Sequence, residues 1–359
     1  MMKLFKKMMA YTAAAVMIVG MFSGCGSANN GNESAAANEG ADAAGKTYTL
    51  GISAYPAFYT WYICEKENLF EKNGVNVELK YFPVYSDCVQ AFSSGQLDMA
   101  AIAMPDTIAP HINNIPFKVV MVNENSNGAD GLVANSDIKT IADLKGKSVA
   151  TEYGTIEHFF LLNALESAGL SESDINFVNL SISDSAPAYL SGSVEAACLW
   201  EPSLSQAQEK ENSNVLITSE DTPGLIPDVV VARDDMIQNN NDDLKAVLNS
   251  YFDAMEFYVA NEDQAIKDMA EGAEISEEEM KVSMSGSKLF SLQQAIDSMD
   301  STAQDYSSLP YTTAKIAEFL NSVNMIDSVP EDTTKMLDSS VLKEILGERG
   351  DIAAPDTKK

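Results

Sequence analysis

The chain has 359 residues, 45% of them hydrophobic, and its 53 acidic side chains outnumber 23 basic ones to give a formal net charge of −30 at pH 7. A surface this acidic repels nucleic acids and anionic lipids, so neither is an expected partner. Four cysteines without a CxxC pair and only two histidines argue against a metal site or a histidine-based catalytic set, and no cofactor is expected.

The N-terminal segment has the plan of an export signal. Lysines near the start precede an uncharged run, residues 8–24, which is shorter than a membrane-spanning helix needs. The phrase FSGC resembles a bacterial lipoprotein signal, in which the cysteine, here Cys25, is lipidated and becomes the new N-terminus; Phe22 stands where such signals usually carry leucine. Residues 1–24 are therefore predicted to be a lipoprotein signal peptide. An ordinary cleaved signal and an uncleaved anchor are the alternatives.

The next segment, residues 25–46, is predicted to be a flexible tether. It contains Gly, Asn, Ala and Glu but no large apolar side chain, so it cannot bury enough surface to offset the entropy of ordering. Two acyl chains suffice for stable membrane anchoring. The protein is therefore expected outside the cytoplasm, anchored to the cell membrane by lipid on Cys25.

From about Lys46 onward the pattern alternates strands with helices. Strands are predicted at residues 48–53, 75–83, 97–104, 147–153, 175–181, 194–200 and 214–219, and helices at 58–74, from Ser86 and at 156–169, with shorter helices between the later strands. After the stretch PDVVVARDDM, residues 227–236, the chain is predicted to be helical. Helical patterns at 243–260, 274–286 and 312–323 follow. This order predicts an α/β fold of βαβ units with mainly parallel sheets and a helical C-terminal tail.

Several phrases, in this order, resemble the solute-binding proteins of ABC importers for nitrate, sulfonate and taurine. They are the helix ending in LFEKNG, the turn AFSSGQLD, the stretch IADLKGKSVATEYGTIEHFFLLNALESAGL and the stretch GSVEAACLWEPSLSQA. The similarity runs from about Thr47 to Arg233. Within it, GTIEHFFLLNALESAGL and PDVVVARDD resemble the taurine-binding members.

The resemblance implies a two-lobed periplasmic-binding-protein fold of type II, with the solute in the cleft between the lobes. The chain is expected to cross between lobes near residues 131–136 and 228–234, so that lobe 1 is 47–132 with 234–359 and lobe 2 is 133–233. It also implies a monomer that performs no reaction and delivers a small solute to the permease and ATPase subunits of an ABC importer.

Ligands of open parallel sheets bind beyond the carboxyl ends of the strands, where helix N-termini also point. The segments expected there carry rings and carboxylates but no Lys or Arg, which favours an amine, amidine or guanidinium over a free anion. The candidate ligand-binding residues are Tyr55, Phe58, Asp106, Glu152, Tyr153, Thr155, Trp200, Glu201 and Asp228.

The resemblance sharpens the expected role of Asp228, because the matching acid of the taurine-binding members holds the ligand's amino group. Those members are rich in hydroxyls where this chain has TIEH: Thr155 keeps one, whereas Ile156 loses one and Glu157 adds a negative charge. A small amine-bearing or nitrogen-rich solute is therefore preferred, with taurine-like aminosulfonates second and pyrimidine precursors third.

Structural roles remain as alternatives at several of these positions. Asp106 and Glu157 are also suited to helix starts, and Asp228 to a hinge. An enzyme on the same fold, resembling the pyrimidine synthases, would need a reactive group near the cleft; Cys198 is the candidate, and its apolar neighbours indicate inert burial. A disulfide between Cys64 and Cys88 stays open.

Overall fold

The computed structural model describes residues 46–358, which belong to one compact unit, Gly45–Lys359. The predicted signal peptide, the lipidation site Cys25 and nearly all of the predicted tether lie outside the described residues, so these predictions stay untested. Within 46–358, no helix has the length and hydrophobicity required to span a bilayer.

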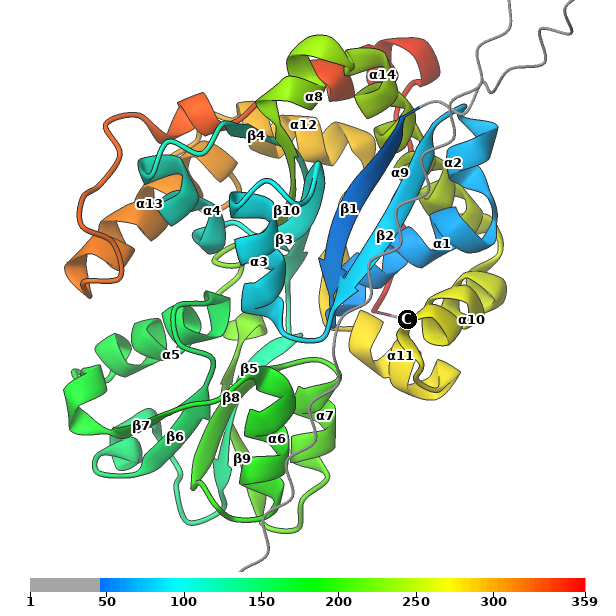
Figure 1. The fold of residues 1–359 in the computed structure, drawn as a ribbon. Helices are drawn as coiled ribbons and strands as arrows, with labels where there is room; N and C mark the ends of the chain where they lie inside the picture. Colours follow the sequence, from blue (N-terminus) through cyan, green and yellow to red (C-terminus); the bar gives the residue numbers. More distant parts are fainter. Residues whose placement is uncertain (1–45, 359) are drawn as a thin grey trace, which may run out of the picture. The chain divides into compact units, whose positions relative to one another are not determined.

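The first sheet has six strands, and helices cover both of its faces (Figure 1). Its order is β11 (Ser287–Leu289), β4 (Phe117–Ser126), β10 (Pro227–Arg233), β3 (Met99–Ala103), β1 (Thr47–Ser53) and β2 (Asn76–Phe82). Strand β1 runs parallel to β2 and β3, whereas β10 is antiparallel to both β3 and β4. The amino end of β10 therefore lies beside the carboxyl ends of β3 and β4.

The second sheet has five strands in an equivalent order. These are β7 (Asn176–Asn179), β6 (Ser148–Thr151), β8 (Ala196–Trp200), β5 (Asp130–Asn135) and β9 (Ser213–Thr218). Strand β6 is parallel to β7 and β8, and β5 is antiparallel to β8 and β9. The expected two-lobed α/β fold is therefore present, with sheets that mix parallel and antiparallel pairs.

The helices that accompany the first sheet come from both ends of the described chain. They are η1 (Pro56–Tyr59), α1 (Thr60–Lys66), α2 (Leu69–Lys72), α3 (Tyr85–Ser93), α4 (Pro105–Ile112), α8 (Asp234–Asn239), α9 (Asn241–Ala260), α10 (Glu262–Ala273), α11 (Glu277–Met284), α12 (Leu292–Asp300), α13 (Leu309–Ser322), η5 (Thr333–Met336) and α14 (Ser340–Arg349). In Figure 1, α1, α2 and α9 lie on one side of this sheet and α3 and α4 on the other.

The second sheet is covered by helices from the middle of the chain. They are η2 (Ile141–Leu144), α5 (Ile156–Ser167), η3 (Glu172–Asp174), α6 (Ile182–Leu190), α7 (Ser203–Gln208) and η4 (Ser219–Asp221). Helices α5 and α6 both pack on β8, and α7 packs on β5 and β9.

The helix predicted at 58–74 is divided in the structure. A 3-10 turn opens it, and α1 ends before Asn68, whose φ of 55° is left-handed and interrupts the helical hydrogen bonds. The helical region ends by Gly74, as predicted, because Gly74 has a φ of 76°, a conformation that glycine adopts without strain.

The chain passes from the first sheet to the second between Ser126 and Asp130, and returns between Thr218 and Pro227. Both passages come slightly earlier along the chain than the crossings expected near 131–136 and 228–234. Residues 131–136 lie mostly within β5, and residues 228–234 lie mostly within β10. Polar residues near the start of these strands, Asp130 and Asp228, make both stretches resemble linkers in the sequence. No strand is predicted at 117–126, yet β4 occupies it.

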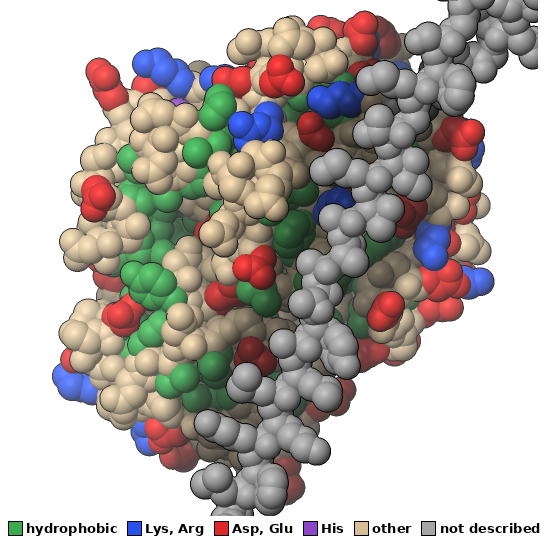
Figure 2. All heavy atoms as spheres, viewed as in Figure 1, with side chains coloured by type: hydrophobic (Ala, Val, Ile, Leu, Met, Phe, Trp, Pro, Cys, Tyr) green, Lys and Arg blue, Asp and Glu red, His purple; other side chains and the backbone are tan. Residues whose placement is uncertain are grey.

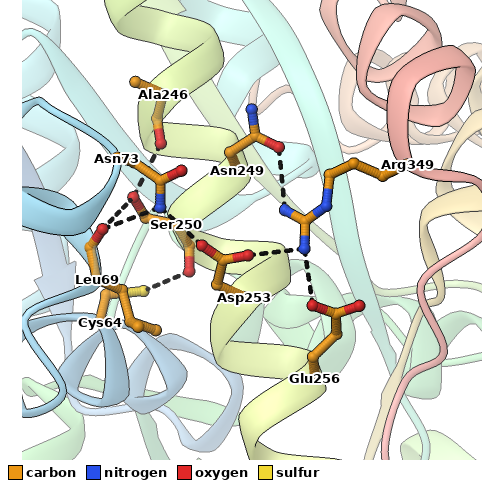
Figure 3. Close-up of polar contacts among 9 residues, drawn as sticks. All are labelled: Cys64, Leu69, Asn73, Ala246, Asn249, Ser250, Asp253, Glu256 and Arg349. Carbon is orange, nitrogen blue, oxygen red and sulfur yellow. Dashed lines mark hydrogen bonds and ion pairs between the residues drawn. The ribbon is translucent and has the colours of Figure 1, made fainter.

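A polar cluster fixes the C-terminal helix α14 against α9 (Figure 3). The Arg349 guanidinium contacts Asp253 and Glu256, each at 2.7 Å, and Asn249 at 3.1 Å. Asp253 also accepts a hydrogen bond from Asn73 at 2.7 Å. Residues from α9, α14 and the end of α2 are therefore held together although they are far apart in sequence.

The cysteines of the described region do not form a disulfide. Cys64, Cys88 and Cys198 are free and buried, and the Cys64 thiol donates a hydrogen bond to the Ser250 carbonyl at 3.3 Å (Figure 3). The pairing of Cys64 with Cys88 left open by the sequence is thus absent.

Acidic side chains are scattered over the face shown in Figure 2, among fewer basic ones. This distribution agrees with the strongly negative net charge of the chain.

Candidate functional site

A small cavity lies where the two sheets meet. Its lining comes from both: Tyr55, Phe58, Tyr85, Ala103 and Asp228 from the first sheet and its connections, Asp130, Ile156 and Trp200 from the second, and Ile226 from the returning crossing. The centre of a water molecule has only about 10 Å³ in which to move there. In this arrangement the two halves are closed on each other, and a solute must part them to enter.

Asp228 reaches the cavity because β10 begins there. In the antiparallel register Asp228 pairs with Ala103 of β3 on one side and with Glu124 of β4 on the other, and the register shifts immediately after Asp228. Two carboxyl groups therefore lie opposite each other within one sheet, an arrangement that is unfavourable when both are ionised.

Tyr55 brings its phenol to the same carboxyl groups from the loop after β1. Its hydroxyl donates to Glu124 Oε1 at 2.9 Å and lies 3.4 Å from Asp130 Oδ2. Burial raises the Tyr55 pKa well above its usual value, so the phenol remains a donor. Its ring packs against Phe58, with centroids 5.1 Å apart.

The second sheet contributes its own pair of acids. Asp130, the first residue of β5, is the cross-strand partner of Trp200, the last residue of β8. Glu157, in the first turn of α5, is fully buried beside Asp130 and accepts a hydrogen bond from the Cys198 thiol at 3.0 Å.

Two further acids connect the halves reciprocally. Asp106, at the start of α4, accepts hydrogen bonds from the Tyr85 hydroxyl at 2.7 Å and from the backbone N–H of Ile156, at the start of α5. Glu152, from the second half, accepts from the backbone N–H of Ser86, in the first turn of α3, at 3.2 Å. Each half thus places a carboxyl group on a helix N-terminus of the other, where the helix dipole favours negative charge.

A second, somewhat larger space adjoins the first. It is lined by Ser53, Ala54, Pro83, Tyr85, Glu152, Ile182, Ser183, Trp200 and Ser203, and leaves about 40 Å³ for the centre of a water molecule. Tyr85 and Trp200 line both spaces. Their rings meet edge to face with centroids 5.4 Å apart, one from each half of the molecule.

The crossings themselves are tied by serines. Ser126 donates to Asp130 and is 2.6 Å from the Ser219 hydroxyl, which also accepts from the backbone N–H of Gly128 at 2.7 Å. This links the outgoing crossing to the returning one, next to the cavity.

No Lys or Arg is among the residues that line either space, and the charged residue types there are all acids. Desolvation raises the pKa of Asp106 to about 7, of Glu124 to about 7 and of Asp130 to about 6. It raises the pKa of Glu157 and Asp228 well above their usual values, and the neighbouring carboxyl groups raise them further. A bound cation would lower the free-energy cost of ionising these buried carboxyl groups.

The sequence-predicted residues fall into three groups. Tyr55, Phe58, Trp200 and Asp228 line the first cavity, and Glu152 lines the second. Asp106 does not line the cavity but contacts two residues that do, Tyr85 and Ile156. The others, Tyr153, Thr155 and Glu201, line neither space.

Those three residues make local contacts instead. Tyr153 is 58% exposed and packs against His158, Thr155 donates to the Glu152 carbonyl at 2.8 Å, and Glu201 accepts from the Ser205 hydroxyl at 2.7 Å. Which of the nine residues contact a solute stays a prediction.

Five residues that line the first cavity are absent from the sequence-based set: Tyr85, Ala103, Asp130, Ile156 and Ile226. Glu124, which contacts Tyr55 and pairs with Asp228 without lining the cavity, is absent as well. A signal for Glu124 exists, since it is the only charged residue in the apolar stretch VVMVNENS, but it is informative only once that stretch is recognised as a strand. Within residues 46–358 no cluster of His, Cys, Asp and Glu has the arrangement of a metal site.

This two-sheet architecture, with a site at the junction, defines a class of proteins that close two lobes on a small molecule. The structure aligns with the aliphatic sulphonate binding protein SsuA from Escherichia coli, with a TM-score of 0.67 over 83% of this chain and 99% of that one, at 19% identity. It also aligns with the desulfurization enzyme DszB, with a TM-score of 0.62 over 84% of this chain and 99% of that one, at 14% identity.

Sequence comparison gives the family. Residues 55–297 match the family described as NMT1/THI5 like, and the chain belongs to that family. It is 28% identical to the taurine-binding periplasmic protein of Escherichia coli over 63% of this chain and 70% of that protein.

Proposed function

We propose that this protein is the solute-binding component of an ABC importer and that it captures a small amine-bearing solute between its two lobes. The observation that carries this proposal is the group of buried carboxyl groups around an aromatic-lined cavity whose lining contains no Lys or Arg. The family and the similarity to a taurine-binding periplasmic protein support the transport role.

The argument for an amine is electrostatic. Transferring a carboxylate from water to a buried position is costly unless it is paired, and unpaired acids respond by holding protons. An ammonium or guanidinium group would supply both the missing charge and the missing hydrogen-bond donors. Nitrate or a simple sulfonate would add negative charge next to Asp228 and Glu124.

Aminosulfonates such as taurine fit less well. Their amino end would find the carboxyl groups, but their sulfonate end would have only backbone and hydroxyl donors along a lining without cations. We therefore rank cationic amines before taurine-like zwitterions, and pyrimidine precursors third.

The site supports binding without chemistry. Burial, together with the neighbouring Glu157 carboxyl, raises the pKa of the Cys198 thiol well above its usual value, so the reactive thiolate is disfavoured. A role as an enzyme on this fold would require another nucleophile or acid–base pair. We propose an extracytoplasmic monomer, anchored through Cys25, that works with permease and ATPase subunits.

The test is a binding panel on the purified protein. Primary amines, guanidines, taurine, alkanesulfonates, nitrate and aminopyrimidines are compared by thermal shift and then by calorimetry. At a ligand concentration 100 times the dissociation constant, a true ligand stabilises the fold by about 2.7 kcal/mol. We expect responses from cationic amines, and a response from anions alone would overturn the proposal.

Asp228→Asn gives the site-specific arm of this test. Replacing the carboxylate by an amide removes a charged partner, and we expect affinity for the responding amine to fall by roughly 1–3 kcal/mol. Glu166→Gln on the exposed side of α5 is the control, because it removes the same charge away from the cavity. Equal affinities for the wild type and Asp228→Asn would exclude Asp228 as a ligand-binding residue.

A further inference from the structure

The two adjoining spaces each contain a buried carboxylate oxygen that no group donates to. In the first this is Asp228 Oδ2, on a side chain that is 3% exposed. In the second it is Glu152 Oε2, on a side chain that is 6% exposed. Asp228 and Glu152 line their spaces directly, so their free oxygens are available to a ligand there.

The other carboxyl oxygens here are used differently. Glu124 Oε1 accepts from Tyr55, and Glu152 Oε1 accepts from the backbone N–H of Ser86. Asp228 and Glu124 are also within hydrogen-bonding reach of each other, which requires a proton on one of them because two carboxylates have no donor. Both spaces therefore keep acceptor capacity that the protein itself does not satisfy.

The wall between the spaces is apolar and separable. It consists of the Tyr85 and Trp200 rings, which come from opposite halves of the molecule and meet edge to face. When the halves part, these rings part with them and the two spaces become one elongated cleft. An alkyl chain is the group that such a pair of rings would cover on closing.

We propose that the solute carries two separated cationic nitrogen groups, one held by Asp228 and the other by Glu152, with an apolar linker between the Tyr85 and Trp200 rings. This inference rests on the proposed function, since it concerns the same site, and it specifies a second end for the ligand. A diamine or an amino-guanidine has the required chemistry.

The experiment compares diamines with monoamines of the same length by calorimetry on the purified protein. The probes are ethylenediamine, putrescine and cadaverine against ethylamine, butylamine and pentylamine, with taurine as the zwitterion. We expect at least one diamine to bind about tenfold or more tightly than its matched monoamine, which corresponds to about 1.4 kcal/mol. The best linker length reports the separation of the two acid groups.

Glu152→Gln separates the two ends. The amide keeps an oxygen for the Ser86 N–H, so the fold should be retained, and thermal unfolding of the variant checks this. We expect Glu152→Gln to lower the advantage of the diamine over its matched monoamine from about tenfold to nearly none. Asp228→Asn should weaken both, and the exposed Glu166→Gln neither.

The outcomes distinguish this inference from the proposed function. If monoamines bind as tightly as diamines and Glu152→Gln has no effect, the second cationic end is wrong and the amine-binding function stands. If taurine binds more tightly than every diamine, the second end is also wrong. If no amine binds at all, both proposals fail.

Discussion

Glu124 shows, at the scale of one residue, that an acid placed beside the candidate site can lower the stability of the fold. It lies in a strand, fully buried, opposite Asp228 and hydrogen-bonded to Tyr55. Desolvation, the largest cause, raises its pKa from 4.5 to about 7, with Asp130 adding repulsion and the bonds from Asp228, Tyr55 and Ser287 opposing the shift. Ionisation of Glu124 at neutral pH lowers the stability of the ligand-free fold. A bound cation nearby would offset that cost.

The raised pKa fixes the sign of a pH effect. Between about 4.5 and about 7 the folded protein holds a proton at Glu124 that the unfolded chain has lost, so its contribution to stability falls as pH rises through this window. Glu124→Gln removes the titration. We expect the variant to resemble the wild type at pH 5 and to exceed it at pH 8 by up to about 3 kcal/mol.

Urea unfolding of both proteins without ligand, at the two pH values, measures this difference. Surface ion pairs and the buried His158, whose pKa burial lowers, contribute equally to both proteins and cancel in the comparison. A wild-type advantage at pH 8 would show that Glu124 is not held in a protonated state by its surroundings.

Gly286 is a second residue whose identity the structure requires. Its carbonyl accepts from the backbone N–H groups of Asn127 and Ala129, at 2.8 and 3.2 Å, and so joins the residue before β11 to the outgoing crossing. A Cβ on Gly286 would lie 2.6 Å from the Ala129 nitrogen and 2.8 Å from its Cα, which only a backbone shift can relieve.

We expect Gly286→Ala to lower stability by roughly 1–3 kcal/mol, measured by urea unfolding, because the added methyl overpacks against backbone. Gly347→Ala in α14 is the matched control, since nothing lies within 4 Å of its Cβ position. There the same change should be neutral or stabilising by about 0.5–1 kcal/mol. If Gly286→Ala and Gly347→Ala change the free energy of unfolding equally, the close approach of residue 286 to Ala129 does not affect stability.

At the scale of elements, the sequence predicts strands and helices most accurately where the hydrophobic residues follow a single period. The alternation in residues 75–83 and the apolar run at 97–104 lead correctly to β2 and β3, because β2 alternates exposed and half-buried residues over most of its length and β3 is buried throughout. Residues 117–135 defeat this reasoning. There β4 ends in the polar run NENS, and β5 opens with Asp130, so both strand ends look like loop.

The same cause hides part of the site. Asp130 lines the cavity and Glu124 contacts Tyr55, which lines it too, and a polar residue in a strand weakens the very pattern that identifies the strand. Asp228 is predicted from its place at a strand edge, and the resemblance of its stretch to the taurine-binding members supplies its expected role. The pairing of Asp228 with Glu124 requires the antiparallel register of β10, which no local pattern specifies.

The packing of α14 on α9 gives a prediction at this scale. Arg349 neutralises Asp253 and Glu256 on α9, and its side chain is 25% exposed (Figure 3). Arg349→Met keeps the apolar part of the side chain but removes the positive charge, so Asp253 and Glu256 are left to repel each other. We expect a loss of roughly 1 kcal/mol in urea unfolding, reduced by added salt.

Lys315→Met is the control for Arg349→Met. Lys315 pairs only with Glu318 within one exposed turn of α13, so its removal should cost less than about 0.5 kcal/mol. No loss of stability in Arg349→Met would mean that α14 is held by its buried Val341, Leu342 and Ile345 alone.

At the scale of the whole molecule, the closed arrangement is held by contacts that a solute must interrupt on entry. The Tyr85–Trp200 ring contact and the hydrogen bonds from Ser86 to Glu152 and from Ile156 to Asp106 all join one half to the other. The crossings, tied through Ser126 and Ser219, are the continuous connections about which the halves would move. Hinge closure of this kind is a signal that a membrane partner can detect.

Tryptophan fluorescence tests this movement, because the chain has two tryptophans in different surroundings. Trp200 lies in the cleft, whereas Trp61 is stacked on Phe70 within the helices of the first sheet, with ring centroids 6.3 Å apart. We expect a bound amine to change the emission of the wild type and of Trp61→Phe. Trp200→Phe should lose that change, and calorimetry shows whether it still binds. A ligand response that survives in Trp200→Phe and vanishes in Trp61→Phe would place the moving contact inside the first lobe, and the solute with it.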